Sequence, residues 1–242
     1  MIPMKILFLD CFSGIAGDMF LGAMLDAGLK LETLELELGK VAFEDYRLKV
    51  KRVEKKAIWA TKLDVILERE DAHSHRKYSD IVGMIRQSGL SPKIKEDALG
   101  IFTILAKAEM QVHRKKSISE VAFHEVGGVD SIVDIAGASI AVNEMGISQV
   151  FSSPLNVGRG KGKFHGKVFD IPAPATRLIL KGIPTYVDGE GEMVTPTGAS
   201  IVKYYVRKFD RPEMRVIKEG YGAGDFELKH PNVLKVTIGE KM

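Results

Sequence analysis

The sequence predicts an α+β protein in which mixed sheets pack against helices. Residues 46–54 and 58–68 alternate apolar and polar side chains, as the half-exposed strands of an antiparallel hairpin do. Longer stretches with apolar residues three and four positions apart indicate helices, and their order mixes antiparallel with crossover connections. We divide the chain near residues 70–78 into a small strand-helix-hairpin module, residues 1–72, and a larger mixed α/β region, residues 73–242.

The composition limits the kind of protein this chain can be. Of its 242 residues, 45% are hydrophobic, which is enough for a substantial core, and a net charge of +3 gives no reason to expect nucleic acid as a partner. The single cysteine, Cys11, excludes an intramolecular disulfide and a cysteine-cluster metal site. Because we find neither a membrane-spanning apolar run nor a secretion signal, we expect a cytoplasmic protein without a membrane partner.

The first predicted elements are a short buried strand over residues 5–10, a loop of small residues, and a helix over about residues 18–27. We interpret Asp10 and Asp18 as an acidic pair at the end of the strand, available to a metal. The alternative is that Asp18 or Ser13 only caps the helix.

A polar segment follows the hairpin and carries His73 and His75. Their spacing lets both imidazoles reach one metal from an extended chain, and a solvated linker is the alternative. Two helices are predicted next, over residues 79–88 and 92–115, the second capped by Ser91.

The stretch from His124 to Asp134 concentrates an imidazole and three carboxylates around a Gly-Gly turn. Apolar residues then continue almost all round a helix as far as Gly146, so this helix should be mostly buried. A cap formed by Asp130, or by Ser131 with Asp134, would explain one or two of these groups. A divalent metal would satisfy all of them, and imidazole with carboxylate suits Zn, Ni, Fe or Mn.

Glycines alternate with Arg159, Lys161 and Lys163 in a loop after the central helix. Such a loop lets backbone and cations approach a phosphate or a carboxylate closely, and a mobile hairpin tip is the alternative. A second loop, rich in glycine and hydroxyl groups, contains Thr195 and Thr197.

The remaining elements frame these loops. We predict a strand over residues 149–155, a helix after Pro172, a helix over about residues 200–209, and closing strands at 216–220 and 233–238.

Three motifs in one order, Asp10–Met19, His124–Asp134 and Val194–Ala199, resemble the LarC family. The resemblance implies insertion of nickel into pyridinium-3,5-bisthiocarboxylic acid mononucleotide, which makes the nickel-pincer nucleotide cofactor. It implies a nickel chelatase of the lyase class, coupled to CTP hydrolysis with Mg²⁺ or Mn²⁺. Members of the family have a longer histidine run and a further C-terminal domain. We therefore expect that CTP hydrolysis requires that domain, supplied in this case as a separate chain. Assembly of this chain into a homo-oligomer is a further possible partnership.

The resemblance names the metal, and the residue patterns described above supply the candidate groups. Glu125 and Asp130 are the expected catalytic groups. The expected metal ligands are His124, Glu125, Asp130, Asp134, Asp10, Asp18, His73 and His75. The expected substrate-binding residues are Arg159, Lys161, Lys163, Thr195 and Thr197.

Two other functions compete with a chelatase. One is a non-catalytic nickel carrier, in which His73 and His75 collect metal for another chain. The other is a metal-dependent hydrolase, in which Glu125 acts as a base on a metal-bound water.

Overall fold

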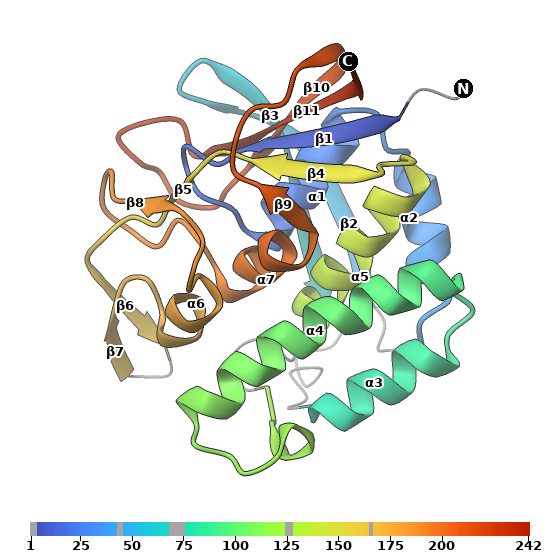
Figure 1. Cartoon of the computed structure of the whole chain (residues 1–242), viewed down its shortest axis with the longest axis vertical. Coiled ribbons are helices and arrows are strands. Elements are labelled where there is room, and N and C mark those ends of the chain that lie inside the picture. Colours follow the sequence, from blue (N-terminus) through green and yellow to red (C-terminus); the bar gives the residue numbers. More distant parts are fainter. Residues whose placement is uncertain (1–3, 43–45, 68–75, 124–127, 165–166) are drawn as a thin grey trace.

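A mixed seven-stranded sheet forms the centre of the protein (Figure 1). We describe it from a computed structural model, which defines residues 4–42, 46–67, 76–123, 128–164 and 167–242. The strand order is β2-β3-β10-β11-β1-β4-β9. These strands are β1 (Lys5–Asp10), β2 (Tyr46–Lys55), β3 (Ile58–Leu67), β4 (Gln149–Ser152), β9 (Val206–Lys208), β10 (Met214–Ala223) and β11 (Val233–Lys241).

Both strand directions occur in this sheet. Strand β1 runs antiparallel to β11 and parallel to β4. Two small sheets accompany the main one, formed by β5 (Leu155–Asn156) with β8 (Thr185–Tyr186) and by β6 (Lys161–Phe164) with β7 (Lys167–Asp170). Mixed sheets packed against helices confirm the predicted α+β class.

The helices lie on one side of the main sheet in two layers (Figure 1). Helices α1, α5 and α7 form the layer next to the sheet, and α4 packs across α5 and α7 with α3 beyond it. The helices are α1 (Gly17–Asp26), α2 (Leu31–Leu38), α3 (Tyr78–Gln87), α4 (Pro92–Val112), α5 (Val129–Glu144), α6 (Pro174–Ile179) and α7 (Pro196–Tyr205), with a short 3₁₀ turn, η2, at Ile118–Glu120.

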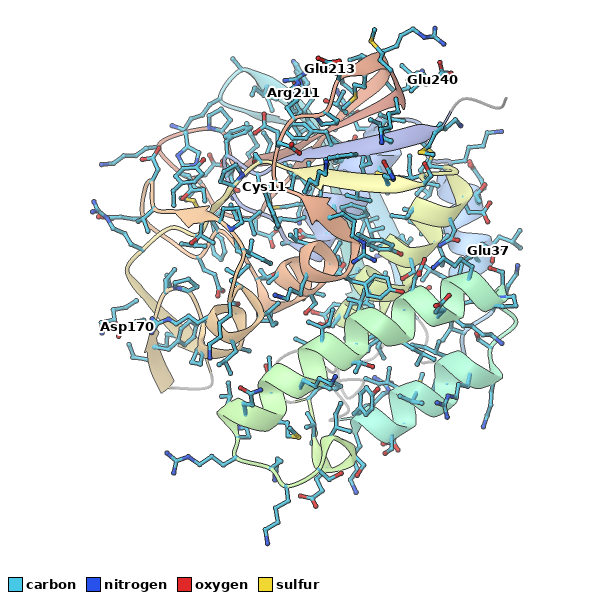
Figure 2. All side chains as sticks on the ribbon, viewed as in Figure 1. Cys11, Glu37, Asp170, Arg211, Glu213 and Glu240 are labelled. Atoms are coloured by element: carbon cyan, nitrogen blue, oxygen red, sulfur yellow. The ribbon has the colours of Figure 1, made fainter. Side chains whose placement is uncertain are left out.

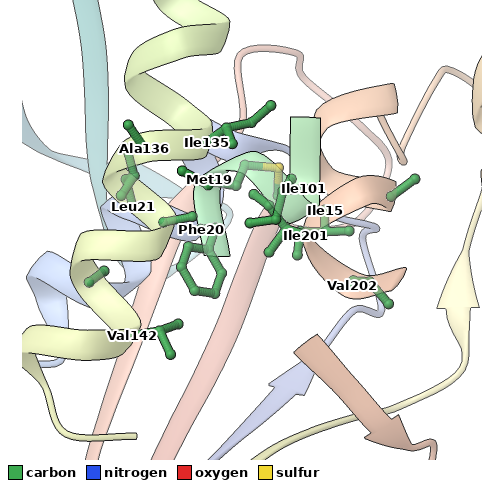
Figure 3. Packing of buried hydrophobic residues seen from close by; sticks show 14 of the residues in the cluster. Ile15, Met19, Phe20, Leu21, Ile101, Ile135, Ala136, Val142, Ile201 and Val202 are labelled. Atoms are coloured by element: carbon green, nitrogen blue, oxygen red, sulfur yellow. The ribbon is translucent and has the colours of Figure 1, made fainter. Parts of the chain in front are cut away.

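Helix α1 lies unusually close to β10. A Cβ atom added to Gly222 would overlap the carbonyl oxygen of Met19, and one added to Gly220 would overlap that of Ala23. Glycines on the strand therefore let the helix backbone rest directly on the sheet. The opposite side of α1 contributes Phe20 and Leu21 to the core (Figure 3).

Helix α5 is buried over most of its circumference, as predicted. Ile135, Ala136 and Val142 project from it into the core (Figure 3). The alternative of a side-chain cap is excluded, because the N-cap residue is Gly128 and no described side chain makes the capping hydrogen bond. The carboxylates of its first turns are consequently not engaged as caps.

Several local predictions are confirmed. Strands β2 and β3 pair as an antiparallel hairpin, and Ser91 caps α4 by accepting a hydrogen bond from the Ile94 amide at 3.4 Å. The helix predicted over residues 200–209 ends at Tyr205 instead, because the chain continues as β9 and pairs with β4.

The first 72 residues share the main sheet with the rest of the chain. Strand β3 pairs with β10, and β1 lies between β11 and β4. The division into residues 1–72 and 73–242 stays a prediction about organisation along the sequence.

Candidate functional site

A cavity of about 550 Å³ lies where the N-terminal ends of three helices meet beside β3. Helix α1 contributes Asp18, helix α5 contributes Asp130 and Asp134, and the start of α7 contributes Thr195 and Thr197. Helix N-termini attract negative charge, which is why carboxylates are tolerated together at this point. The structure thus brings together five of the residues singled out in the sequence.

Close packing between α1 and α5 sets the distance between their carboxylates. A Cβ atom at Gly17 would overlap the side chain of Asp134, so only glycine fits at the first position of α1. Asp18 follows directly and lines the same cavity. The Gly-Asp pair of the first motif therefore has a steric reason as well as a chemical one.

A buried lysine of β3 enters the same cluster. Lys62 is only 6% exposed, and its ammonium group donates a hydrogen bond to Asp18 and forms ion pairs with Asp225 at 2.8 Å and Asp64 at 3.5 Å. Burial alone would lower the pKa of Lys62, but Asp18 and Asp225 raise it above its ordinary value. Lys62 is therefore a charged ammonium at neutral pH.

The carboxyl groups respond to the same burial. Burial raises the pKa of Asp134 well above its usual range, and the neighbouring charges of Asp18 and Asp130 raise it further. Burial also raises the pKa of Asp18, against the opposing effect of Lys62. Crowded carboxylates with raised pKa values are the arrangement that a bound cation would relieve.

The start of α7, on one side of the cavity, is fixed by a helix cap and by a close backbone contact. Thr195 caps α7 by accepting a hydrogen bond from the Gly198 amide at 3.1 Å. A Cβ atom at Gly198 would overlap the carbonyl oxygen of Ile15, so α7 begins in direct contact with the loop that precedes α1. Glu192, which lies just before α7, also lines the cavity.

Strand β7 supplies an aromatic wall. Phe169 borders the cavity together with the apolar residues Val65 and Ile66 of β3 and Ala173. The β6–β7 hairpin that carries Phe169 stands at the left edge of the molecule, where Asp170 is labelled in Figure 2.

Asp10 is not part of this cavity. It lies at the end of β1, opposite Lys235 of β11. Burial raises the pKa of Asp10, while Lys235 and Arg211 lower it. Of the acidic pair that the sequence suggested, Asp18 lines the cavity and Asp10 does not.

The cations of the glycine-rich loop also lie outside the cavity. Arg159 and Lys161 border a separate recess with Glu190, and Lys161 forms an ion pair with Asp170. In the hairpin register, Lys161 and Lys163 project from the face opposite to that of Phe169. A phosphate held by these lysines would therefore sit on the outer side of the hairpin.

Four of the predicted metal ligands lie outside the described residues, namely His73, His75, His124 and Glu125. Over the ranges that the structure defines, no group of three or more His, Cys, Asp and Glu side chains is arranged to hold a metal ion. No helix in those ranges is both long enough and apolar enough to cross a membrane.

Sequence reasoning missed several residues of the cavity, namely Lys62, Asp64, Phe169, Glu192 and Asp225. Lys62 and Asp64 are charged residues on a strand face that otherwise carries apolar side chains. This interruption is the one feature of the sequence that could have indicated them. Asp225 follows a Gly-rich segment and gave no signal of its own.

The sequence of this chain has relatives among known proteins. A family model described as nickel insertion protein matches residues 7–242. The chain is 47% identical to the pyridinium-3,5-bisthiocarboxylic acid mononucleotide nickel insertion protein of Desulfitobacterium hafniense, over 98% of this chain and 59% of that protein. It is 46% identical to the protein of the same name from Geobacillus kaustophilus, over 98% and 60% of the two chains.

A further relative, a putative nickel insertion protein of Dictyoglomus thermophilum, is 44% identical over 98% of this chain and 61% of its own length. The chain thus spans about three fifths of the length of these curated relatives. No solved structure matches.

Proposed function

The chain belongs to the nickel insertion protein family, and from this membership we propose that it inserts Ni²⁺ into pyridinium-3,5-bisthiocarboxylic acid mononucleotide. Nickel is the cargo of this reaction, and the mononucleotide is the acceptor. Two relatives of this chain are named for that substrate. The proposal assigns the nickel ion and the pyridinium ring of the mononucleotide to the cavity at the helix N-termini.

The observation that carries the proposal is that Asp18, Asp130 and Asp134 line one cavity, although these three described carboxylates are not by themselves arranged to hold a metal ion. Carboxylates accept a divalent cation through oxygen, and nickel is among the metals suited to a mixture of carboxylate and imidazole. His124 and Glu125 come immediately before α5 in the sequence and are proposed to complete the ligands. The thiocarboxylate groups of the substrate supply further ligands during transfer.

Lys62 has a proposed supporting role. Its ammonium group donates a hydrogen bond to Asp18 and forms an ion pair with Asp225, which orients both carboxylates in the absence of metal. The amide groups at the N-terminal ends of α1, α5 and α7 complement anionic groups of the mononucleotide. Thr197 lines the same cavity and offers a hydroxyl group to that ligand.

Coupling to CTP with Mg²⁺ or Mn²⁺ belongs to the proposal and rests on the family resemblance. The relatives extend beyond the part that this chain spans, and the proposal assigns the coupling to CTP to the segment that corresponds to that remainder. Arg159 of the glycine-rich loop is proposed to contact the phosphate group of the mononucleotide.

Incubation with Ni²⁺, CTP and the metal-free mononucleotide tests the function, with the nickel-bound product followed by mass spectrometry. We expect product with the unchanged chain and the C-terminal portion of a relative, and a loss of at least about tenfold with Asp130→Asn. Asp210→Asn, at an exposed aspartate outside the cavity, is the control.

The same assay separates a chelatase from a carrier. A carrier binds nickel but yields no product in any combination, whereas a chelatase releases more than one product per chain. Full product formation by Asp130→Asn would remove the cavity from the reaction.

A further inference from the structure

We propose that Phe169 is the platform on which the pyridinium ring of the mononucleotide stacks. This inference rests on the proposed function and assigns a specificity-determining residue to it. It follows from the position of the Phe169 ring, from its neighbour across the hairpin, and from the charge of the surrounding cavity.

Among the described residues that line the cavity, Phe169 is the one with an aromatic side chain. The other lining groups are carboxylates, hydroxyls, one ammonium and small or aliphatic side chains. Phe169 is half-buried, so its ring is held by the fold yet accessible from the cavity. A planar ligand that enters the cavity can therefore reach one aromatic surface.

The hairpin fixes the orientation of this ring. Gly162 of β6 is the cross-strand partner of Phe169, and a Cβ atom at Gly162 would overlap the ring. Phe169 therefore packs on the bare backbone of Gly162, which supports the ring on one side. An aromatic ring over a strand glycine also stabilises a hairpin by itself, so the test must separate ligand binding from hairpin stability.

The chemistry of the cavity matches a ring that is both aromatic and positively charged. The face of a phenylalanine ring carries negative electrostatic potential and attracts a cation placed over it. Among the described lining residues the acidic side chains outnumber the one ammonium group, that of Lys62, and so add to that attraction. A pyridinium ring is both aromatic and positively charged. A dihydropyridine ring has the same size but is neutral, so neither the Phe169 ring nor the carboxylates would attract it by charge.

The test measures the affinity of the full chain for the metal-free mononucleotide by calorimetry. Phe169→Leu should weaken binding by about 5- to 30-fold, the range of a desolvated cation–π contact, while Phe169→Trp retains it. Gly162→Ala should weaken binding as Phe169→Leu does, because it displaces the ring. Val168→Ala is the matched control, since Val168 is 63% exposed and projects from the opposite face of the same strand.

A second pair of ligands separates charge from shape. Oxidised nicotinamide mononucleotide carries a pyridinium ring, and its reduced form carries a neutral ring on the same ribose phosphate. The unchanged protein should prefer the oxidised form, and Phe169→Leu should lose most of that preference. Nickel binding, measured in parallel, should be the same in all variants.

Three results would overturn the inference. Unchanged mononucleotide affinity in Phe169→Leu would show that the ring does not contact the ligand. Equal losses for the oxidised and reduced ligands, without rescue by Trp, would reduce Phe169 to a support of the hairpin. Failure of the unchanged protein to bind the mononucleotide would overturn the proposed function, and with it the role of Phe169.

Discussion

The surroundings of Asp134 are unfavourable to its own charge. Its half-buried side chain lies at the junction of α1 and α5, where Gly17 leaves just enough room for it. Folding raises its pKa, so the native state binds this proton more tightly than the unfolded chain does. The free energy of unfolding should therefore fall as the pH rises from the ordinary carboxyl range, about 4, through the raised native pKa.

Asp134→Asn removes that penalty. We expect a melting temperature higher by about 2–4 °C at neutral pH and a weaker dependence of stability on pH, measured by calorimetry without metal. Asp18, whose pKa is also raised, keeps part of the pH dependence. Nickel binding should weaken by about 10- to 100-fold in the same variant. A melting temperature that does not change would mean that water reaches Asp134 in the native state.

Asp10 distinguishes the site inferred from sequence from the site seen in the structure. The sequence includes Asp10 among the metal ligands, whereas the structure places it opposite Lys235 and away from the cavity. We expect Asp10→Asn to leave nickel affinity unchanged in calorimetry. A loss comparable with that of Asp130→Asn would return Asp10 to the metal site.

Arg159 tests the proposed phosphate contact. Its planar guanidinium group matches two phosphate oxygens, and Lys161 is already engaged by Asp170. Arg159→Ala should weaken mononucleotide binding by about 1.5–3 kcal/mol and leave nickel binding unchanged. Lys163→Ala, on the same hairpin, is the comparison. Normal mononucleotide affinity in Arg159→Ala would make the loop a solvated turn.

Residues of the cavity differ in how far sequence could identify them. Asp18, Asp130 and Thr197 belong to local motifs at the starts of helices, and the pattern of each motif indicated them. Lys62 and Phe169 reach the cavity from strands, where neighbouring residues say nothing about what lies opposite. Such residues are recognised as part of the cavity only when the packing of these strands against the distant helices α1, α5 and α7 is known.

At the scale of elements, α1 rests directly on β10, where glycines replace side chains. Gly222→Ala should destabilise the protein by about 1–3 kcal/mol, because the added methyl group must displace the backbone at Met19. Chemical denaturation measures this directly.

Gly83 provides the matched control for that substitution. It lies inside α3 with no atom within 4 Å of an added Cβ. Gly83→Ala should stabilise the protein by about 0.5–1 kcal/mol, the usual gain of alanine over glycine in a helix. Equal effects of the two substitutions would show that α1 does not rest on β10 as described.

The predictability of the elements follows the range of their interactions. The β2–β3 hairpin and helices α3, α4 and α5 were found because periodicity and caps are local signals. Helix α2 was missed, since it has only two turns and is held by contact with α5. The helix predicted to residue 209 was too long because pairing with β4 converts its end into β9.

At the scale of the whole molecule, the main sheet joins strands from residues 5–67 with strands from residues 149–241. Strand β10 is the neighbour of β3 on the side toward the centre of the sheet, and it also provides the surface on which α1 packs. A fragment of residues 1–72 should therefore lack a cooperative thermal transition in circular dichroism. A cooperative transition would establish these residues as an independent domain.

The position of β1 has a consequence for synthesis on the ribosome. Lys5 pairs with Glu240, so one edge of β1 must wait until almost the whole described chain has been translated. At about 5–20 residues per second that delay is on the order of tens of seconds. β4 emerges earlier and can protect the other edge. During this interval the nascent sheet exposes an unpaired, apolar strand, which makes it a natural client of chaperones that bind extended segments.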